Sequence, residues 1–366
     1  MLVKDLMDII QGLAPPDLAE EWDNPGLQIG SPQEPVRKVA LALDATEKTV
    51  EEAISNGCNF LFVHHPLIFK PLKKIDNSTM TGRIISRAAA AGLTIFAAHT
   101  NWDSAEKGVA QALADVLQLE ERRPLEPAMR DFYKLVVFVP AGYENRLRQA
   151  LFEAGAGTIG DYDHCWFALR GEGGFRPPED ANPFLGERGR ENRVPESRLE
   201  VIAPRYLAGR LAEVVRAVHP YEEPAFEFQP VKVQSSGQGL GLIGQWNPPR
   251  DLLTALRETC GLGSLKWAGL KPGTVSRVAL LPGSGGGYMS AAKSAGAEVL
   301  ITGDVGYHLA LEAESLGLTL VDLGHFETEW PSIRQMAGLL KNALKSEDLE
   351  CLILNQRPPW HYGAGN

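Results

Sequence analysis

Residues 39–66, VALALDATEKTVEEAISNGCNFLFVHHP, decide the fold of the chain. Two short apolar runs rich in strand-forming residues, 39–44 and 59–63, are separated by a polar segment with helical spacing. A third apolar run, 93–98, follows a second helical segment. This alternation predicts a largely parallel sheet with helices on both faces, because parallel strands need crossover connections that cover the sheet.

The last third of the chain repeats this order. Residues 92–94 and 317–319 are both Gly-Leu-Thr, and each apolar run that follows ends at a histidine, His99 or His325. We interpret the repeat as a duplicated α/β unit, whose two copies form a three-layer α/β/α core.

The middle of the chain has a different pattern. Its apolar runs and helical segments follow the order strand, helix, strand, strand, helix, strand, which is typical of a ferredoxin-like α+β domain. A segment rich in glycine, proline and charge, Gly171 to Pro195, interrupts this order and is expected to be a mobile surface loop. We therefore predict core halves at 1–128 and 234–366 and an inserted domain at 129–233.

Composition restricts the classes of function. The net charge of −10 and the pI of about 5.4 do not favour nucleic-acid binding by neutralisation of phosphates. The four cysteines form no C-x-x-C pair, which argues against a disulfide framework or a thiolate zinc site. No apolar run reaches the roughly 18 residues of a membrane span. We expect a soluble, cytoplasmic protein with no membrane association.

The first candidate site is the pair His64 and His65 at the end of an apolar run. Neighbouring side chains in a strand point to opposite faces, so both histidines can serve one cleft only where the strand has ended. Pro66 marks that end and holds His65 extended. The carboxyl edge of a parallel sheet is also where α/β proteins place their sites. An exposed pair of histidines at a turn is equally compatible with this pattern.

The second candidate is the run His99-Thr-Asn-Trp-Asp103. Asp103 begins a capping box with Glu106, so its simplest role is to cap a helix, although one carboxylate oxygen can cap while the other binds a metal. For His99 we favour a buried histidine that is hydrogen-bonded to the backbone over a metal ligand.

The third candidate is His325 with Glu329, which stand four residues apart, as His99 and Asp103 do. Side chains at this spacing meet on one face of a helix. Glu327 competes for the role of the carboxylate. We prefer Glu329 because the duplication places it opposite Asp103.

With His99 set aside, the candidates together supply three imidazoles and two carboxylates near the ends of strands. Five ligands without a thiolate exceed what one catalytic zinc needs, and a bridging carboxylate would give each of two ions about three. Such ligands suit Zn, Fe, Mn, Co or Ni. Asp304 and His308 are candidates for orienting the ligands. The glycine-rich run 282–288 is a candidate loop for contact with a substrate.

Several motifs together resemble the Nif-three-like dinuclear metal centre family, whose members are often called GTP cyclohydrolase 1 type 2 homologues. These motifs are WDNPGLQIG at 22–30, VHHPL at 63–67, HTNWD at 99–103, ITGDVGYH at 301–308 and GHFETE at 324–329. The middle of the chain, with HPYEEPAFE at 219–227, is similar to the PII-like or CutA-like insert of longer bacterial members.

The resemblance implies two divalent metal cations per subunit, bound by His64, His65, Asp103, His325 and Glu329. In that family pattern Glu329 bridges, His65 and Asp103 bind one ion, and His64 and His325 bind the other. The resemblance also implies a toroidal homohexamer whose metal sites face an internal cavity.

Two functions follow as hypotheses. The first is a metal-dependent hydrolase that acts on a nucleotide-like substrate, with His99 as the catalytic proton shuttle. The alternative is a non-catalytic metal-binding or regulatory hexamer, in which the PII-like insert senses a small-molecule ligand. A scaffold for a protein partner is a third option.

Overall fold

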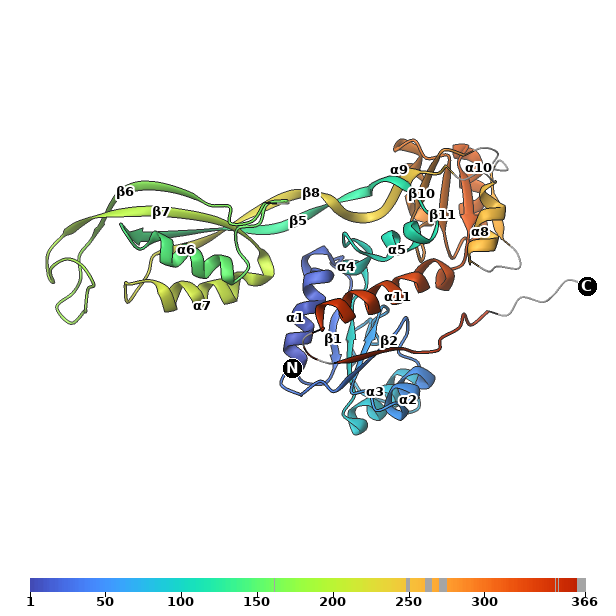
Figure 1. The fold of residues 1–366 in the computed structure, drawn as a ribbon, viewed down its shortest axis with the longest axis horizontal. Coiled ribbons are helices and arrows are strands. Elements are labelled where there is room, and N and C mark those ends of the chain that lie inside the picture. The colour runs from blue at the N-terminus through green and yellow to red at the C-terminus, as the bar shows by residue number, and fades with distance from the viewer. Residues whose placement is uncertain are drawn as a thin grey trace, which may run out of the picture. The chain divides into compact units, whose positions relative to one another are not determined.

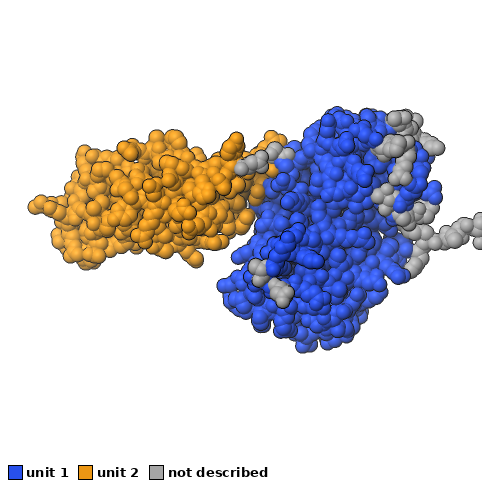
Figure 2. Space-filling view, in the orientation of Figure 1, with its two compact units in different colours: residues 1–128, 236–366 blue, residues 129–235 orange. Residues whose placement is uncertain are grey.

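The computed structural model describes residues 1–160, 162–247, 251–260, 265–269, 275–345, 347 and 349–360, and only the backbone of residues 236 and 259 (Figure 1). Residues 1–128 and 236–366 form one compact unit, the core unit, and residues 129–235 form the insert unit (Figure 2). None of the helices in the described part of the chain has the length and apolar character that a bilayer span requires.

One sheet of the core unit has five strands in the order β1-β4-β3-β2-β13, and its edge strand β13 comes from the C-terminal segment of the chain. Its parallel strands are β2 (Lys38–Ala42), β3 (Phe60–Val63), β4 (Thr94–Ala97) and β13 (Glu350–Ile353), and β1 (Gly26–Ile29) is antiparallel to β4. The three strands expected from the apolar runs are therefore confirmed, and they are parallel.

Helices cover both faces of this sheet. The helices on one face are α1 (Val3–Leu13) and α11 (His325–Ala343), and those on the other are α2 (Glu47–Ser55) and α3 (Met80–Ala91). Side chains alternate along each strand, so Leu41 packs with the first pair of helices and its neighbours Ala40 and Ala42 with the second. This arrangement is the expected three-layer α/β/α core.

The part of the second sheet that lies in the core unit repeats this pattern. The parallel strands are β10 (Arg277–Leu280), β11 (Val299–Thr302) and β12 (Thr319–Asp322), with β8 (Phe226–Gln245) antiparallel to β10 and β9 (Lys266–Ala268) antiparallel to β12. The covering helices are α9 (Met289–Ser294) and α10 (Tyr307–Leu316) on one face and α5 (Val109–Val116) and α8 (Leu252–Cys260) on the other. Strand β9 lies antiparallel beside β12, just as β1 lies antiparallel beside β4. The predicted duplication is therefore confirmed.

The insert unit has the ferredoxin-like order. Along the chain the elements are β5 (Glu120–Pro140), α6 (Glu144–Glu153), β6 (Phe167–Phe175), β7 (Asn192–Pro204), α7 (Ala208–Val218) and β8, and the strands lie in the order β6-β7-β5-β8. Strands β5 and β8 continue from the core unit into the insert unit. Helices α6 and α7 pack through Leu147, Leu151 and Leu211 onto one face of the sheet.

The loop expected in the insert is shorter than predicted. The segment from Gly171 to Pro195 is not a loop throughout, because its two ends pair as strands of a β6–β7 hairpin from Gly171↔Glu196 to Phe175↔Asn192. Only residues 176–191 connect the strands. The end of β6 from Gly171 to Phe175 contains three glycines and no buried side chain, so it lacks the alternation of buried residues that marks a strand in a sequence.

Candidate metal centre

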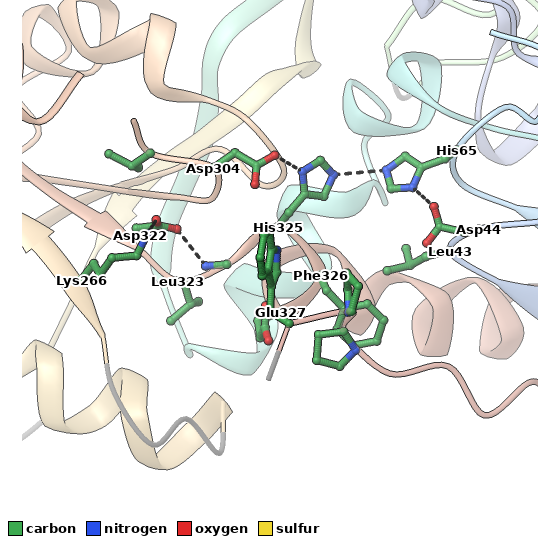
Figure 3. Close-up of a pocket in the computed structure, with 15 residues that line it drawn as sticks. Leu43, Asp44, His65, Lys266, Asp304, Asp322, Leu323, His325, Phe326 and Glu327 are labelled. Atoms are coloured by element: carbon green, nitrogen blue, oxygen red, sulfur yellow. Dashed lines mark hydrogen bonds and ion pairs between the residues drawn. The ribbon is translucent and has the colours of Figure 1, made fainter. Parts of the chain in front are cut away.

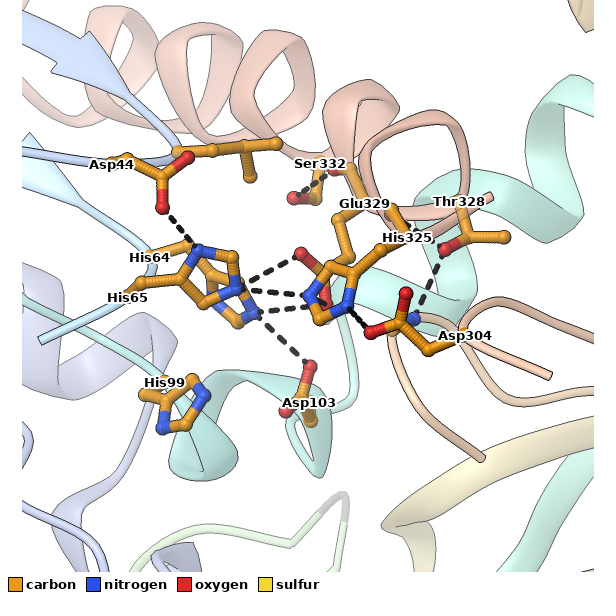
Figure 4. A network of polar contacts seen from close by, with 12 residues as sticks. Asp44, His64, His65, His99, Asp103, Asp304, His325, Thr328, Glu329 and Ser332 are labelled. Atoms are coloured by element: carbon orange, nitrogen blue, oxygen red, sulfur yellow. Dashed lines mark hydrogen bonds and ion pairs between the residues drawn. The ribbon is translucent and has the colours of Figure 1, made fainter. Parts of the chain in front are cut away.

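The candidate centre lies in the core unit, where strands of both halves end. His64 and His65 directly follow β3, and His325 begins α11 just after β12. The short helix α4 (Thr100–Asp103) follows His99 at the end of β4. His65 and His325 are 260 residues apart in the sequence, yet their Nε2 atoms lie 3.3 Å apart (Figure 4).

Glu329 is the carboxylate around which the imidazoles gather. Its Oε2 lies 3.1 Å from Nε2 of His65, and its Oε1 lies 3.1 Å from Nε2 of His325 and 3.7 Å from Nε2 of His64. Asp103 adds a second carboxylate, with Oδ1 3.6 Å from Nε2 of His64. The structure therefore brings all five expected ligands together (Figure 4).

Each imidazole ring is held in position by a hydrogen bond from its Nδ1 atom to an oxygen acceptor. The acceptors are the Ala98 carbonyl for His64, Asp44 for His65, Asp23 for His99 and Asp304 for His325, at 2.8, 2.8, 2.8 and 2.7 Å respectively. Carbonyl and carboxylate oxygens only accept, so Nδ1 carries the proton and donates. In the neutral ring Nε2 then carries a lone pair that points into the cluster.

The cluster fits metal cations on its own chemistry. The Nε2 lone pairs of the imidazoles and the carboxylates of Glu329 and Asp103 converge. These electron-rich groups repel one another unless protons or cations lie among them. Nε2 of His64 and Oε2 of Glu329 are buried, and within the described part of the chain neither makes a hydrogen bond of good geometry. Metal-bound histidines usually donate their other N–H to a carboxylate or carbonyl, as these do.

The pKa values show how strongly the groups act on one another. Burial alone would lower the pKa of His65, but hydrogen bonds to Asp44 and Glu329 raise it to about 10. The hydrogen bond to Glu329 raises the pKa of His325 to about 9, against the effect of burial. Burial opposes ionisation of Glu329, yet the surrounding imidazoles hold its pKa well below the usual range. Without cations the cluster therefore retains protons at neutral pH.

Distances between the potential ligand atoms show which side chains of the cluster lie nearest to one another. His65, His325 and Glu329 form one set of potential ligand atoms within 4.8 Å of one another. Nε2 of His64 is about equally far from both carboxylates, at 3.6 Å from Oδ1 of Asp103 and 3.7 Å from Oε1 of Glu329.

His99 is closer to the cluster than expected. Its ring joins His64 and His65 in a second set of potential ligand atoms within 4.8 Å. The expected hydrogen bond to the backbone was wrong, because Nδ1 contacts the carboxylate of Asp23 instead. Asp23 also accepts from the backbone and hydroxyl of Thr100, which begins α4, so its two oxygens fix both the ring and the start of the helix.

Among the residues that hold the imidazoles, Asp44 was not found from the sequence. It follows β2 at the same edge of the sheet as the histidines, which is the one signal that would have suggested it. Asp304 holds His325 as expected. His308 contacts the ring of Tyr307 on α10 and takes no part in the hydrogen bonds that hold the imidazoles.

The glycine-rich run 282–288 contributes one close approach. A Cβ atom on Gly283 would lie 2.4 Å from Oε1 of Glu329, and the residue has φ +71°, which favours glycine. Its backbone N–H donates to Oγ1 of Thr328 at 3.0 Å. Gly283 therefore leaves room for the central carboxylate.

A cavity of about 610 Å³ opens beside the cluster (Figure 3). His65 and His325 form part of its wall, together with Asp44 and Asp304, which hold their Nδ1 atoms. Lys266 also lines the cavity, and its Nζ lies 2.8 Å from Asp322. This volume is within the usual range for small-molecule sites.

Comparison with known proteins identifies the family. The model of the Duf34/NIF3 (NGG1p interacting factor 3) family matches residues 1–359. The chain belongs to the Duf34/NIF3 family. A Halalkalibacterium halodurans protein named GTP cyclohydrolase 1 type 2 homolog is 38% identical over 356 residues, which cover 96% of this chain and 93% of that protein. A Bacillus subtilis protein of the same name is 36% identical over 327 residues, or 88% of each chain.

Solved structures agree with this assignment to the Duf34/NIF3 family. A Bacillus cereus protein described as related to NIF3 superposes with a TM-score of 0.82 at 35% identity and covers 99% of both chains. A Staphylococcus aureus protein gives a TM-score of 0.74 at 29% identity, again over 99% of both chains. Both matches extend through the core and insert units.

Proposed function

We propose that this Duf34/NIF3 protein is a metal-dependent hydrolase that binds two divalent cations per subunit. The proposed ligands are His64, His65, Asp103, His325 and Glu329. The observation that carries the proposal is the convergence of Nε2 lone pairs on the buried carboxylate of Glu329, with every ring oriented by an acceptor at Nδ1. Binding of cations would relieve the repulsion within this cluster.

The cations would supply Lewis-acid chemistry, which activates water and polarises an electrophilic centre. Glu329 and Asp103 supply the negative charge that offsets the cations. His99 is the proposed proton carrier, because Asp23 holds its Nδ1–H and leaves Nε2 to accept or give a proton. Burial raises the pKa of Asp23, but hydrogen bonds from His99 and Thr100 outweigh it and lower the pKa to about 2, so Asp23 stays ionised.

A nucleotide-like substrate is the proposed ligand of the cavity beside the cluster. The cavity volume of about 610 Å³ suits a molecule of that size, and His65 and His325 face it. The name that the relatives carry, GTP cyclohydrolase 1 type 2 homolog, points to the same class of substrate. The resemblance described above supports assembly into a homohexamer, which light scattering on the purified protein would test.

The second candidate function is a non-catalytic metal-binding or regulatory protein with a ligand-sensing insert. One observation favours it, namely a separate cleft of about 470 Å³ within the insert unit. The two functions differ in whether the metal-loaded protein turns over any substrate.

Turnover of a panel of nucleotides and phosphoesters by metal-loaded protein tests the proposal. His325→Ala removes a proposed ligand, and His308→Ala is the matched control, because His308 is an exposed histidine on the neighbouring helix α10. We expect turnover by the wild type and the control but not by His325→Ala, with thermal unfolding showing that the variant remains folded. Absence of turnover in all three proteins, with metal bound, would favour the second function.

A further inference from the structure

The insert unit contains a cleft of its own, distant in sequence from the metal ligands. Its volume is about 470 Å³, and it lies between the sheet and the connection 176–191. Leu135, Val137 and Val139 of β5 pack against the helices of the insert, so Phe138, which lines the cleft, faces the opposite side of the sheet. The connection therefore covers a part of the sheet face that the helices leave open.

Aromatic rings form one wall of this cleft. The ring of Tyr221 lies 6.1 Å from that of Phe175 and 6.4 Å from that of Phe184, with interplanar angles of 52° and 48°. Tyr143 packs edge-on against Phe184 at 5.4 Å and supports it from outside the cleft. Phe184 is 45% exposed, so a ligand in the cleft would remove apolar surface from water.

Negative charge forms the other wall. Glu196, Glu222 and Glu223 line the cleft, and no described residue forms an ion pair with any of them. Among the described residues that line the cleft, Arg176 alone is basic, and its Nε donates to the carbonyl of Gly189. The cleft therefore carries an excess of negative charge beside its rings.

The polar groups of the cleft are held in place before any ligand binds. The Tyr221 hydroxyl donates to Oε1 of Glu196 at 2.8 Å, which leaves Oε2 available. A Cβ atom on Gly173 would lie 2.1 Å from that Oε2, so the glycine gives the carboxylate its room. The backbone N–H of Asn182 donates to Glu222 at 3.2 Å and ties the connection to the wall.

Buried His219 fixes the position of Tyr221. Its Nε2 contacts the Phe138 carbonyl at 2.9 Å and therefore carries the proton, while its Nδ1 accepts the backbone N–H of Tyr221 at 3.1 Å. A fixed ring loses little freedom when a ligand binds, which favours affinity.

We propose that this cleft binds a small organic cation of the alkylammonium class. The faces of aromatic rings attract such cations, and the carboxylate of Glu196 supplies the opposite charge at the edge of the same ring. A phosphate or carboxylate ligand would meet three carboxylates instead. The proposal does not depend on the metal centre and would assign a ligand to the insert whether or not the core is catalytic.

Isothermal titration of the full-length protein with choline, and with its neutral isostere 3,3-dimethylbutan-1-ol, tests the proposal. We expect choline to bind at least about tenfold more tightly, because only the cation gains from the rings and carboxylates. Equal affinities would overturn the proposal, since they would show that shape and apolar surface alone act. Failure of choline to bind at millimolar concentration would overturn it as well.

Two variants locate the binding to this cleft. Glu196→Gln keeps an acceptor for the Tyr221 hydroxyl but removes the charge, and Phe184→Leu removes a ring from an exposed position. We expect each to weaken choline binding by about fivefold or more. Glu213→Gln, an exposed change on α7 outside the cleft, is the control and should bind as the wild type does. Wild-type affinity for choline in both cleft variants would contradict the proposal. A change in oligomer mass with Phe184→Leu would also contradict it, because it would indicate that a second copy of the chain covers the cleft.

Discussion

Replacing Asp44 with alanine tests whether the residues behind the imidazoles prepare them for metal binding. Asp44 is the acceptor for Nδ1 of His65, at 2.8 Å, and without it the ring can rotate or carry its proton on Nε2, where it cannot bind a cation. A hydrogen bond to a charged group contributes about 1.5–3 kcal/mol. The Asp44 side chain is 43% exposed, so solvent screening places the loss at the lower end, about tenfold in metal affinity.

The assay is a competition titration of Zn²⁺ against a fluorescent chelator. Asp8→Ala is the matched control, because it removes the same charge from an exposed position on α1. Asp44→Asn should lose less affinity than Asp44→Ala, since its amide oxygen can still accept from Nδ1. If Asp44→Ala bound Zn²⁺ as tightly as Asp8→Ala, the argument that these acceptors orient the ligands would be refuted.

Two further predictions concern protons and backbone. His65 and His325, with pKa values raised to about 10 and 9, hold protons at pH 7 that cations must displace, so metal affinity should rise with pH between 6 and 9. The buffer takes up the released protons, so the measured binding enthalpy should vary with the ionisation enthalpy of the buffer. A binding enthalpy that is the same in all buffers would contradict this prediction. Gly283→Ala places a Cβ 2.4 Å from the central carboxylate at φ +71°, and should lower both metal content and, by about 1–2 kcal/mol, the free energy of unfolding. Gly287→Ala, whose Cβ would meet no atom within 4 Å, is the control, and equal effects in the two variants would sink the idea.

The sequence predicts where the histidines of the proposed site converge, because they lie at the ends of apolar strands. His64 and His65 follow β3, and His325 follows β12, as their neighbouring apolar runs indicate. Carboxyl ends of parallel strands share one edge of a sheet, so such residues converge even when hundreds of positions separate them. The duplicated core and the family resemblance could be recognised from the same runs and motifs.

Of the residues that hold the imidazoles, Asp304 was predicted, but Asp23 and Asp44 were not assigned this role from the sequence. Asp23 meets His99 across 76 positions, and Asp44 meets His65 across 21, through loops whose paths depend on packing of the whole core unit. The distances of His64 and His65 from Asp103 and Glu329 likewise depend on side-chain directions beyond the strand ends. Strand β6 was expected, but its end from Gly171 to Phe175 was taken for loop because this glycine-rich stretch gives no periodic signal.

The central proposal is that Glu329 and the other proposed ligands would hold two cations in one cluster, and elemental analysis of protein purified without added metal tests it directly. Wild-type protein should contain about two transition-metal ions per chain, and Glu329→Gln at most about one, because the neutral amide cannot bridge them. Glu327→Gln, a change to the neighbouring glutamate that lines the cavity, should retain both ions. Equal metal content in Glu329→Gln and the wild type would contradict the account.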